Sequence, residues 1–428
     1  MVTAYRDHGL LGRLAPGALS RFVDRVYPVP LTLSDWRRGP VREENSDAEE
    51  RYIRAILDIC EHERLDTVFP SWDPEVLLLS RNKPRFTERA ITVPVPEWPV
   101  LQRTMDKYSL IETATALGFP CPRTYLPSTH AEVQELADRL GFPLVVKPRF
   151  SAGARGTYLV TDRPQLGTVI RRVEPTFGMP ILQEWVPGGQ DRRVSISLTL
   201  DRRGELVSVQ TRRILRSVFR SFSSVPAAQV SCEGMAGTAD AVRLVQSLRY
   251  VGHARVQVKI DPRDGRCKLL EINCRPGFLV WCEIAAGQDI PLLCVRIERG
   301  ESVEKTPSDN DPKVFLSPIE DTLAFGALLL EWCGRRVLPS RWTPPAECDV
   351  TLGDVLRAYR DTYRAPRRLF DGYFRALADD PCAALAWYGS HLTHILREPK
   401  RLPPGMGTLG MGHAADHGLA VRRAEGNP

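Results

Sequence analysis

The sequence predicts an α/β fold of two or three globular domains. Three observations carry this prediction: the length of 428 residues, strands that alternate with helical stretches near the N-terminus, and strand pairs joined by short turns further on. A typical domain has roughly 150 residues, and 43% hydrophobic side chains suffice to fill more than one core.

The composition excludes several classes of protein. The charged fraction of 26% is ordinary for a folded chain, and no apolar run approaches the roughly 20 residues of a membrane-spanning helix. The N-terminus lacks the pattern of a secretory signal. The net charge is only +6, and basic residues are interleaved with acidic ones instead of clustered. We expect a cytoplasmic protein with no membrane or nucleic-acid partner; a homodimer stays open.

Two residue counts bear on possible sites. The ten cysteines show no CxxC pair and no regular spacing, so we expect reduced, mostly buried thiols and neither a zinc site nor a disulfide framework. Only 8 of the 58 basic residues are lysines. A lysine inside a motif is therefore a rare coincidence in this chain and carries weight.

The elements expected along the chain divide it into four parts. Residues 1–103 alternate helices with short strands, which favours an open parallel sheet. Residues 104–300 hold most of the strands, residues 301–400 read as a helical module, and the Gly-rich tail 401–428 is expected to be disordered. The expected helices cover 51–60, 74–80, 106–118, 131–140 and 239–250, and the expected strands cover 66–70, 90–95, 143–148, 158–161, 181–186, 194–201, 206–215, 254–260 and 266–273.

Two lysines and a small-residue loop suggest a phosphate site. Lys107 opens a helix, Lys147 ends a strand, and the loop 151–157 (SAGARGT) follows Lys147 directly. Backbone N–H groups of such a loop can surround phosphates, and a lysine can reach them as a point charge. No Gly precedes a Lys anywhere, so a Walker loop is excluded, and a protein kinase would have its Gly-rich loop before the strand lysine. Surface lysines and a plain turn are the alternative interpretation.

A hairpin near residue 265 predicts a metal site. Glu271 and Asn273 lie two apart on one strand and hence on one face, and a turn centred on 262–265 places Gln257 almost opposite Glu271. Three oxygen ligands then converge, as Mg²⁺ with bound phosphates requires. Arg275 points the same way and can stabilise a phosphoryl or acyl-phosphate oxygen. The alternative is an amphipathic hairpin with a polar outer face.

Taken together, these motifs resemble the ATP-grasp superfamily, above all the ATP-binding halves of the carbamoyl phosphate synthase large subunit. The matching segments are DK at 106–107, VVKP at 145–148, SAGARGT at 151–157, QEWVPG at 183–188 and VQVK with EINCR between 256 and 275. The resemblance implies an ATP-grasp fold behind a Rossmann-like pre-ATP-grasp domain, with a lid at about 123–184.

The resemblance also implies roles for individual residues. Nucleotide contacts are expected from Lys107, Lys147, Ser151, Gly153, Gly156, Thr157, the Gln183 carbonyl, the Val186 N–H, and Asp191 or Glu184. Mg²⁺ or Mn²⁺ is expected on Gln257, Glu271 and Asn273. Arg275 and Arg212 are expected to be catalytic, with Arg213 and Arg216 as weaker candidates, although a chance cluster is plausible among so many arginines.

The implied reaction is an ATP-dependent carboxylate–amine ligation through an acyl phosphate, with small-molecule carboxylate and amine substrates. Three alternatives stay open: carbamoyl-phosphate-like chemistry on bicarbonate, phosphorylation of an alcohol by the same fold, and a non-catalytic ATP-binding protein. Relatives usually carry a strand and helix before a segment like VTAYRD at 2–7, so we expect the first β-α unit to be absent and the first sheet to be small.

Overall fold

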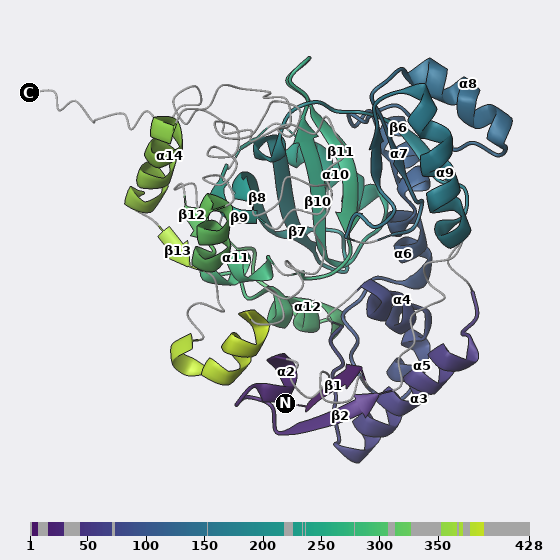
Figure 1. The fold of residues 1–428 in the computed structure, drawn as a ribbon. Coiled ribbons are helices and arrows are strands. Elements are labelled where there is room, and N and C mark those ends of the chain that lie inside the picture. The colour runs from purple at the N-terminus through teal and green to yellow at the C-terminus, as the bar shows by residue number, and fades with distance from the viewer. Residues whose placement is uncertain are drawn as a thin grey trace, which may run out of the picture.

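The computed structural model describes most of the chain between residues 2 and 326 and three shorter parts after it. The described ranges are 2–6, 16–29, 43–70, 73–151, 153–217, 226–232, 234–235, 237–277, 279–306, 313–326, 352–365, 368–370 and 377–388. The expected disordered tail 401–428 lies outside them. Figure 1 shows a large central sheet, a smaller sheet with two helices beside it, and an N-terminal layer below both.

The N-terminal part packs helices around a small parallel sheet. Strands β1 (Val2–Arg6) and β2 (Arg25–Val29) pair in parallel. The expected helices at 51–60 and 74–80 are found as α3 (Asp47–His62), which begins in a capping box, and α4 (Asp73–Arg81); α5 (Lys83–Thr87) and α6 (Trp98–Met105) follow.

The two strands expected at 66–70 and 90–95 are reduced to one parallel bridge, Thr67 with Thr92. Prolines at 70, 94 and 96 flank the bridge and lack the N–H that a longer ladder needs. The absence of a first β-α unit stays a prediction.

A four-stranded antiparallel sheet, which we call the lid sheet, follows α7 (Lys107–Ala116). Its order is β3 (Thr124–Tyr125), β6 (Ile181–Glu184), β4 (Leu144–Lys147) and β5 (Tyr158–Val160). Helices α8 (His130–Leu140) and α9 (Arg163–Phe177) pack on it through a core of their own (Figure 1). Helix α9 was not predicted.

The central sheet has seven strands in the order β11–β10–β7–β8–β9–β12–β13. The predicted strands appear as β7 (Arg193–Leu200), β8 (Leu206–Ser217), β10 (Gly252–Ile260) and β11 (Cys267–Asn273), with α10 (Thr238–Ser247) before β10. Strand β9 (Pro226–Ser231) was not predicted. After β11 come helices α11 (Val280–Ala285) and α12 (Ile290–Glu298).

The C-terminal part is not the purely helical module that the sequence predicts. It contributes strands β12 (Val314–Leu316) and β13 (Arg368–Phe370) to the central sheet, in addition to α14 (Leu352–Arg364). Strand β12 pairs with β9, which would otherwise expose a row of unpaired backbone groups at the sheet edge.

The central sheet has one apolar and one polar face, because side chains alternate along each strand. Val194, Ile196 and Leu198 of β7 face the main core together with Val256 of β10. The opposite face carries polar residues that are nevertheless buried: Ser195, Ser197, Thr199, Gln210, Arg212 and Arg255. This polar face is where the predicted metal ligands lie.

A buried ion pair ties the C-terminal helices to the central sheet. Arg216 of β8 bonds Asp321 with Nε at 2.7 Å and Nη2 at 2.8 Å, and its Nη1 bonds the Thr362 hydroxyl at 2.8 Å. The guanidinium also lies 4.0 Å from the Tyr359 ring centroid. Arg216 is therefore structural and unavailable as the weak catalytic candidate considered above.

Replacing Asp321 with alanine should lower the free energy of unfolding of the part that holds the central sheet by about 3–5 kcal/mol, because it leaves a buried guanidinium unpaired. Urea denaturation followed by circular dichroism measures this change. The matched control is Glu135→Ala, which removes an exposed i,i+4 pair with Arg139 and should cost less than about 1 kcal/mol. Equal losses in the two variants would contradict the structural role of Arg216.

Candidate functional site

The two predicted lysines lie together beside the hairpin of the central sheet. Lys107 is the first residue of α7, whose N-cap is Asp106, and Lys147 is the last residue of β4; each is only 7% exposed. The Lys107 ammonium donates to the Ser151 carbonyl at 2.7 Å. The Lys147 ammonium lies 3.5 Å from the Leu270 carbonyl of β11. The structure thus joins the lysines, the loop and the hairpin, as the sequence predicted.

The electrostatics of this group are those of a site prepared for anions. Burial, together with the nearby charge of Lys107, lowers the pKa of Lys147 to about 7, although Glu271 opposes the shift. Burial also lowers the pKa of Lys107, against the attraction of Glu271 and Asp73. Two ammonium groups that share one buried place repel each other, and an anion placed between them would relieve this repulsion.

The loop after Lys147 owes its shape to glycine. Gly153 and Gly156 have φ of +63° and +72°, in the left-handed region that favours glycine. A Cβ at Gly156 would lie 2.7 Å from the Pro148 ring and 2.9 Å from Phe177. The Thr157 N–H donates to the Ala154 carbonyl at 3.1 Å.

The hairpin has the predicted register. Gln257 is directly opposite Glu271, and Arg255 is opposite Asn273. The Asn273 amide lies 3.4 Å from Glu271 Oε1. Sequence reasoning missed Arg193, which lies on the same face of the neighbouring strand β7 and donates to Gln257 Oε1 at 2.6 Å. Within the described ranges no three His, Cys, Asp or Glu residues cluster as a metal site, so any ion here would rest on one carboxylate and two amides.

Arg275 is held by a carboxylate from the N-terminal part. Its Nε and Nη2 donate to the two oxygens of Asp73 at 2.9 and 2.7 Å. The Nη1 atom of Arg275 lies against Gly277. A Cβ added at Gly277 would lie 2.6 Å from this atom. Asp73, the first residue of α4, was not predicted as a site residue; it lies 202 positions from Arg275, and only its acidic character was visible in the sequence.

Arg212, which the sequence predicted to be catalytic, lies away from the hairpin. It is fully buried and ion-paired to Glu283 of α11 at 2.9 Å, and it bonds Gln210 at 2.7 Å. Its register partner is Ser195, whose own partner is Gln257, so two strand spacings separate Arg212 from the metal ligands. Arg213 alternates to the other face of β8.

The segment predicted to contact the nucleotide through the Gln183 carbonyl and the Val186 N–H is only partly free of sheet pairing. Strand β6 lies between β3 and β4 and is no free edge, because the two residues of β3 pair with it. The Gln183 side chain bonds the Thr124 hydroxyl at 2.8 Å, inside the sheet. Only the residues after Glu184 leave the ladder. There, Lys259 donates to the Val186 and Gly188 carbonyls at 2.8 and 2.7 Å and thereby holds this segment.

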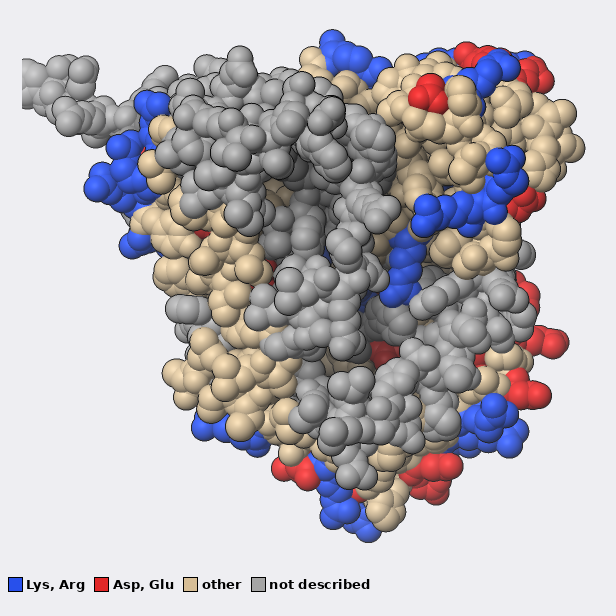
Figure 2. Space-filling view, in the orientation of Figure 1, with Lys and Arg blue, Asp and Glu red and all other residues tan. Residues whose placement is uncertain are grey.

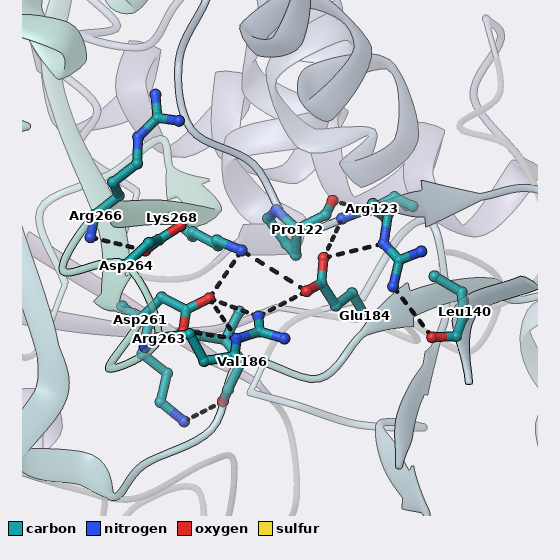
Figure 3. A network of polar contacts seen from close by, with 12 residues as sticks. Pro122, Arg123, Leu140, Glu184, Val186, Asp261, Arg263, Asp264, Arg266 and Lys268 are labelled. Atoms are coloured by element: carbon teal, nitrogen blue, oxygen red, sulfur yellow. Dashed lines mark hydrogen bonds and ion pairs between the residues drawn. The ribbon is translucent and has the colours of Figure 1, made fainter. Parts of the chain in front are cut away.

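Glu184 belongs to an ion network between the lid sheet and the hairpin turn, as Figure 3 shows. It accepts from Arg263 at 2.6 Å and from the Arg123 N–H at 3.0 Å, and Lys268 and Asp261 complete the network. Asp191 is different: its Oδ1 is buried without a partner among the described residues, and burial raises its pKa. Of the two acids left open by the sequence, Asp191 is thus the one available to a ligand.

Most of the described cysteines are buried, as the sequence predicted. Eight cysteines in the described ranges are free thiols, five of them buried, and none is disulfide-bonded. No described helix is both long and apolar enough to cross a bilayer. Figure 2 shows basic side chains beside a hollow near the middle of the molecular face, with an acidic group at its lower end.

Two family models match the chain. The model "Carbamoyl-phosphate synthase L chain, ATP binding domain" matches residues 106–306, and "PylC-like, N-terminal domain" matches residues 46–94. The chain belongs to the ATP-grasp superfamily. The matched ATP-binding domain contains the lysines, the loop and the hairpin described above.

Individual relatives are distant. The carbamoyl phosphate synthase large chain of Deinococcus radiodurans is 25% identical over 291 residues, which are 66% of this chain and 26% of the relative. D-alanine–D-alanine ligase B of Xanthomonas campestris is 24% identical over 187 residues, 41% of this chain and 57% of the relative. The chain therefore spans about a quarter of the length of the synthase chain it matches.

Solved structures confirm the fold. The biotin carboxylase–β-γ-ATP complex from Campylobacter jejuni superposes with a TM-score of 0.55 at 16% identity, covering 73% of this chain and 69% of that one. The biotin carboxylase domain dimer of Hydrogenobacter thermophilus 2-oxoglutarate carboxylase, solved with MgADP, gives 0.55 at 16% identity and covers 73% and 68%.

The depressed pKa of Lys147 predicts that ATP affinity depends on pH. In the free protein this ammonium loses its proton as the pH rises through about 7, whereas bound phosphates would raise its pKa again. Binding must then take up a proton, and affinity should fall by up to about tenfold per pH unit above 7. Calorimetry with MgATP at pH 6.5 and 8.5, in buffers of different ionisation enthalpy, measures both quantities.

The matched control is Lys147→Arg, which keeps its charge over this pH range and should bind with little proton uptake. A wild-type affinity that does not change between pH 6.5 and 8.5 would contradict the assignment of Lys147 to the phosphates.

Proposed function

We propose that this ATP-grasp protein is a ligase that forms a C–N bond between a carboxylate and an amine, with release of ADP and phosphate. The observation that carries the proposal is the convergence of Lys107, Lys147 and Glu271. Two buried cations and one carboxylate ligand lie where a phosphate chain and its metal ion would meet. The similarity to a D-alanine–D-alanine ligase supports amide formation over other outcomes of the fold.

The nucleotide is assigned to the seam between the lid sheet and the central sheet. Lys107, Lys147 and the N–H groups of the loop 151–157, with Ser151 and Thr157, take the phosphates. The Val186 N–H, which follows the end of β6, takes the adenine, and Lys259 holds that backbone in place. Asp191 takes the ribose, since its Oδ1 lacks a partner among the described residues.

The donor set of the hairpin fits a magnesium ion. Glu271 supplies the only charge, and Asn273 and Gln257 supply amide oxygens, which leaves coordination positions for phosphate oxygens and water, as Mg²⁺ prefers. Arg193 already donates to Gln257 Oε1 and would keep that side chain in position. The ion would neutralise phosphate charge; the protein's part is to orient these oxygens.

The protein side of the reaction is positioning and charge stabilisation. A carboxylate oxygen attacks the γ-phosphorus, the bond to the β-bridging oxygen breaks, and ADP leaves. The amine then attacks the acyl carbon, loses a proton, and expels inorganic phosphate. Arg275 is oriented by Asp73 through Nε and Nη2, which leaves Nη1 to bind an oxygen of the transferred group.

The proposal predicts products that distinguish it from its alternatives. ATP alone should be hydrolysed slowly, because the closed site excludes water, and adding the correct carboxylate and amine should raise ADP and phosphate release strongly. The assay is phosphate detection with a panel of amino acids and dipeptides, with hydroxylamine added to trap an acyl phosphate as a hydroxamate.

Release of AMP and pyrophosphate would contradict the mechanism, because the lysines and hairpin are assigned to the γ-phosphate end. A stable phosphoester product would place the protein among kinase-like enzymes of the same fold. Nucleotide binding without turnover across the panel would favour a non-catalytic role.

A further inference from the structure

A cation that the sequence did not predict lies beside the metal ligands of the hairpin. Arg193 is the first residue of β7, and it alternates with Val194 to the polar face of the central sheet, as Ser195 does. Strand β7 is the neighbour of β10, which carries Gln257. The Arg193 side chain therefore lies on the same face as the residues assigned to the magnesium ion.

Two amide oxygens hold the guanidinium of Arg193. Its Nη2 donates to Gln257 Oε1 at 2.6 Å, and its Nη1 donates to Gln190 Oε1 at 3.0 Å. Burial lowers the pKa of Arg193, and the charge of Glu271 opposes this shift. An arginine side chain is protonated at every physiological pH, and amide oxygens do not neutralise it. These contacts thus fix a full positive charge next to the hairpin.

Three cations share the single carboxylate of the hairpin. The charge of Glu271 acts to raise the pKa of Lys107, of Lys147 and of Arg193. These four side chains therefore have positive charge in excess before any metal ion binds. Such an excess favours a phosphate chain and disfavours the binding of several metal ions, because like charges repel in a buried place.

The donor set of the hairpin is small for two ions. Paired metal ions lie about 3.5–4 Å apart, so close that they usually share bridging oxygens. The Gln257 oxygen has two lone pairs, and the bond from Arg193 uses one of them. Glu271 is the one carboxylate of the set, and within the described ranges no three His, Cys, Asp or Glu residues cluster as a metal site. The remaining oxygens suffice for one ion.

The guanidinium also competes with a second ion for space and charge. Mg²⁺ lies about 2.1 Å from a ligand oxygen, so an ion on Gln257 Oε1 comes within about 5 Å of Arg193 Nη2. At that distance the ion and the guanidinium repel each other unless phosphate oxygens lie between them. One ion that shares the phosphates with Arg193 meets this condition. A second ion would add like charge without a further carboxylate.

We propose that Arg193 binds a phosphate oxygen of the nucleotide and takes the place of a second divalent ion, so that the nucleotide complex holds a single ion. A guanidinium suits this role, because it presents several N–H donors in one plane and forms charge-assisted hydrogen bonds to phosphate. The inference rests on the nucleotide and metal sites of the proposed function, and it does not depend on which carboxylate and amine react.

Counting the bound ions tests the proposal without any variant. Mn²⁺ is titrated into full-length protein that is in excess over an ATP analogue whose β- and γ-phosphates are joined by NH. Electron paramagnetic resonance measures the Mn²⁺ that stays free. The expected result is one tightly bound Mn²⁺ per bound nucleotide. Two ions of comparable affinity would overturn the proposal.

Removing the charge of Arg193 tests the phosphate contact. Arg193→Gln should weaken binding of the magnesium complex of the same analogue at least about tenfold in calorimetry, because a charge-assisted hydrogen bond is lost. Arg193→Lys should recover part of this affinity. The matched control is Arg243→Gln, which removes an exposed arginine of α10 that pairs with Asp240 and should leave the affinity unchanged. Equal affinities of Arg193→Gln and the wild type would refute the contact.

Reversing the charge tests whether the guanidinium stands in for an ion. Arg193→Glu places a carboxylate beside Gln257 and should allow a second Mn²⁺ to bind in the complex with the analogue, which the wild type does not. Circular dichroism shows whether the variant is folded. A folded Arg193→Glu protein that still binds a single Mn²⁺ per nucleotide would contradict the proposal.

The proposed function can be judged apart from this inference. Ligation with two ions per nucleotide would refute the role of Arg193 and leave the ligase intact. Pyrophosphate release, together with a single ion and the expected effects at Arg193, would do the reverse.

Discussion

The alternation of side chains along the central sheet is the constraint on which the rest of the structure depends. Strands β11, β10, β7 and β8 send apolar residues to the main core, whereas Ala228 and Val230 of β9 pack in a separate cluster, and buried polar residues lie on the other side. Because both faces are covered, the polar side chains cannot be left to water. They must be paired with one another, as in the ion pair of Arg212 with Glu283, or they must await a ligand.

The same constraint explains why the phosphate site needs three segments that are distant in the sequence. Lys107, Lys147 and Glu271 share a low-dielectric place in which repulsion between the two ammonium groups is strong. Burial is the largest cause of the lowered pKa of each lysine, and at Lys147 the charge of Lys107 adds to it. The N-terminal part takes part directly, since the Asp73 carboxylate of α4 orients Arg275, which follows β11. The segment 46–94, which matches the PylC-like N-terminal domain model, thus contributes a residue that contacts Arg275.

The sequence predicted well those features that depend on residues close together in the chain. The register of Gln257 with Glu271 follows from one short turn and period-two alternation, and the order of Lys147 and its glycine loop is visible in a dozen residues. What it could not predict depends on partners far away in the chain. Arg212 meets Glu283, 71 residues on, and β6 is an inner strand of its sheet because the two residues of β3 pair with it. Likewise, β12 and β13 are three-residue strands without enough length for a periodic signal.

The central claim is that Glu271 holds the metal ion that accompanies the nucleotide, whereas Glu184 belongs to a structural network. Water-proton relaxation in solutions of Mn²⁺ and ADP measures the ternary complex directly and needs no substrate. Glu271→Gln should weaken Mn²⁺ binding in that complex at least about tenfold, since it removes the only charged ligand. Glu184→Gln is the isosteric control and should leave the enhancement close to that of the wild type. An unchanged enhancement in Glu271→Gln, or its loss in Glu184→Gln alone, would contradict the account.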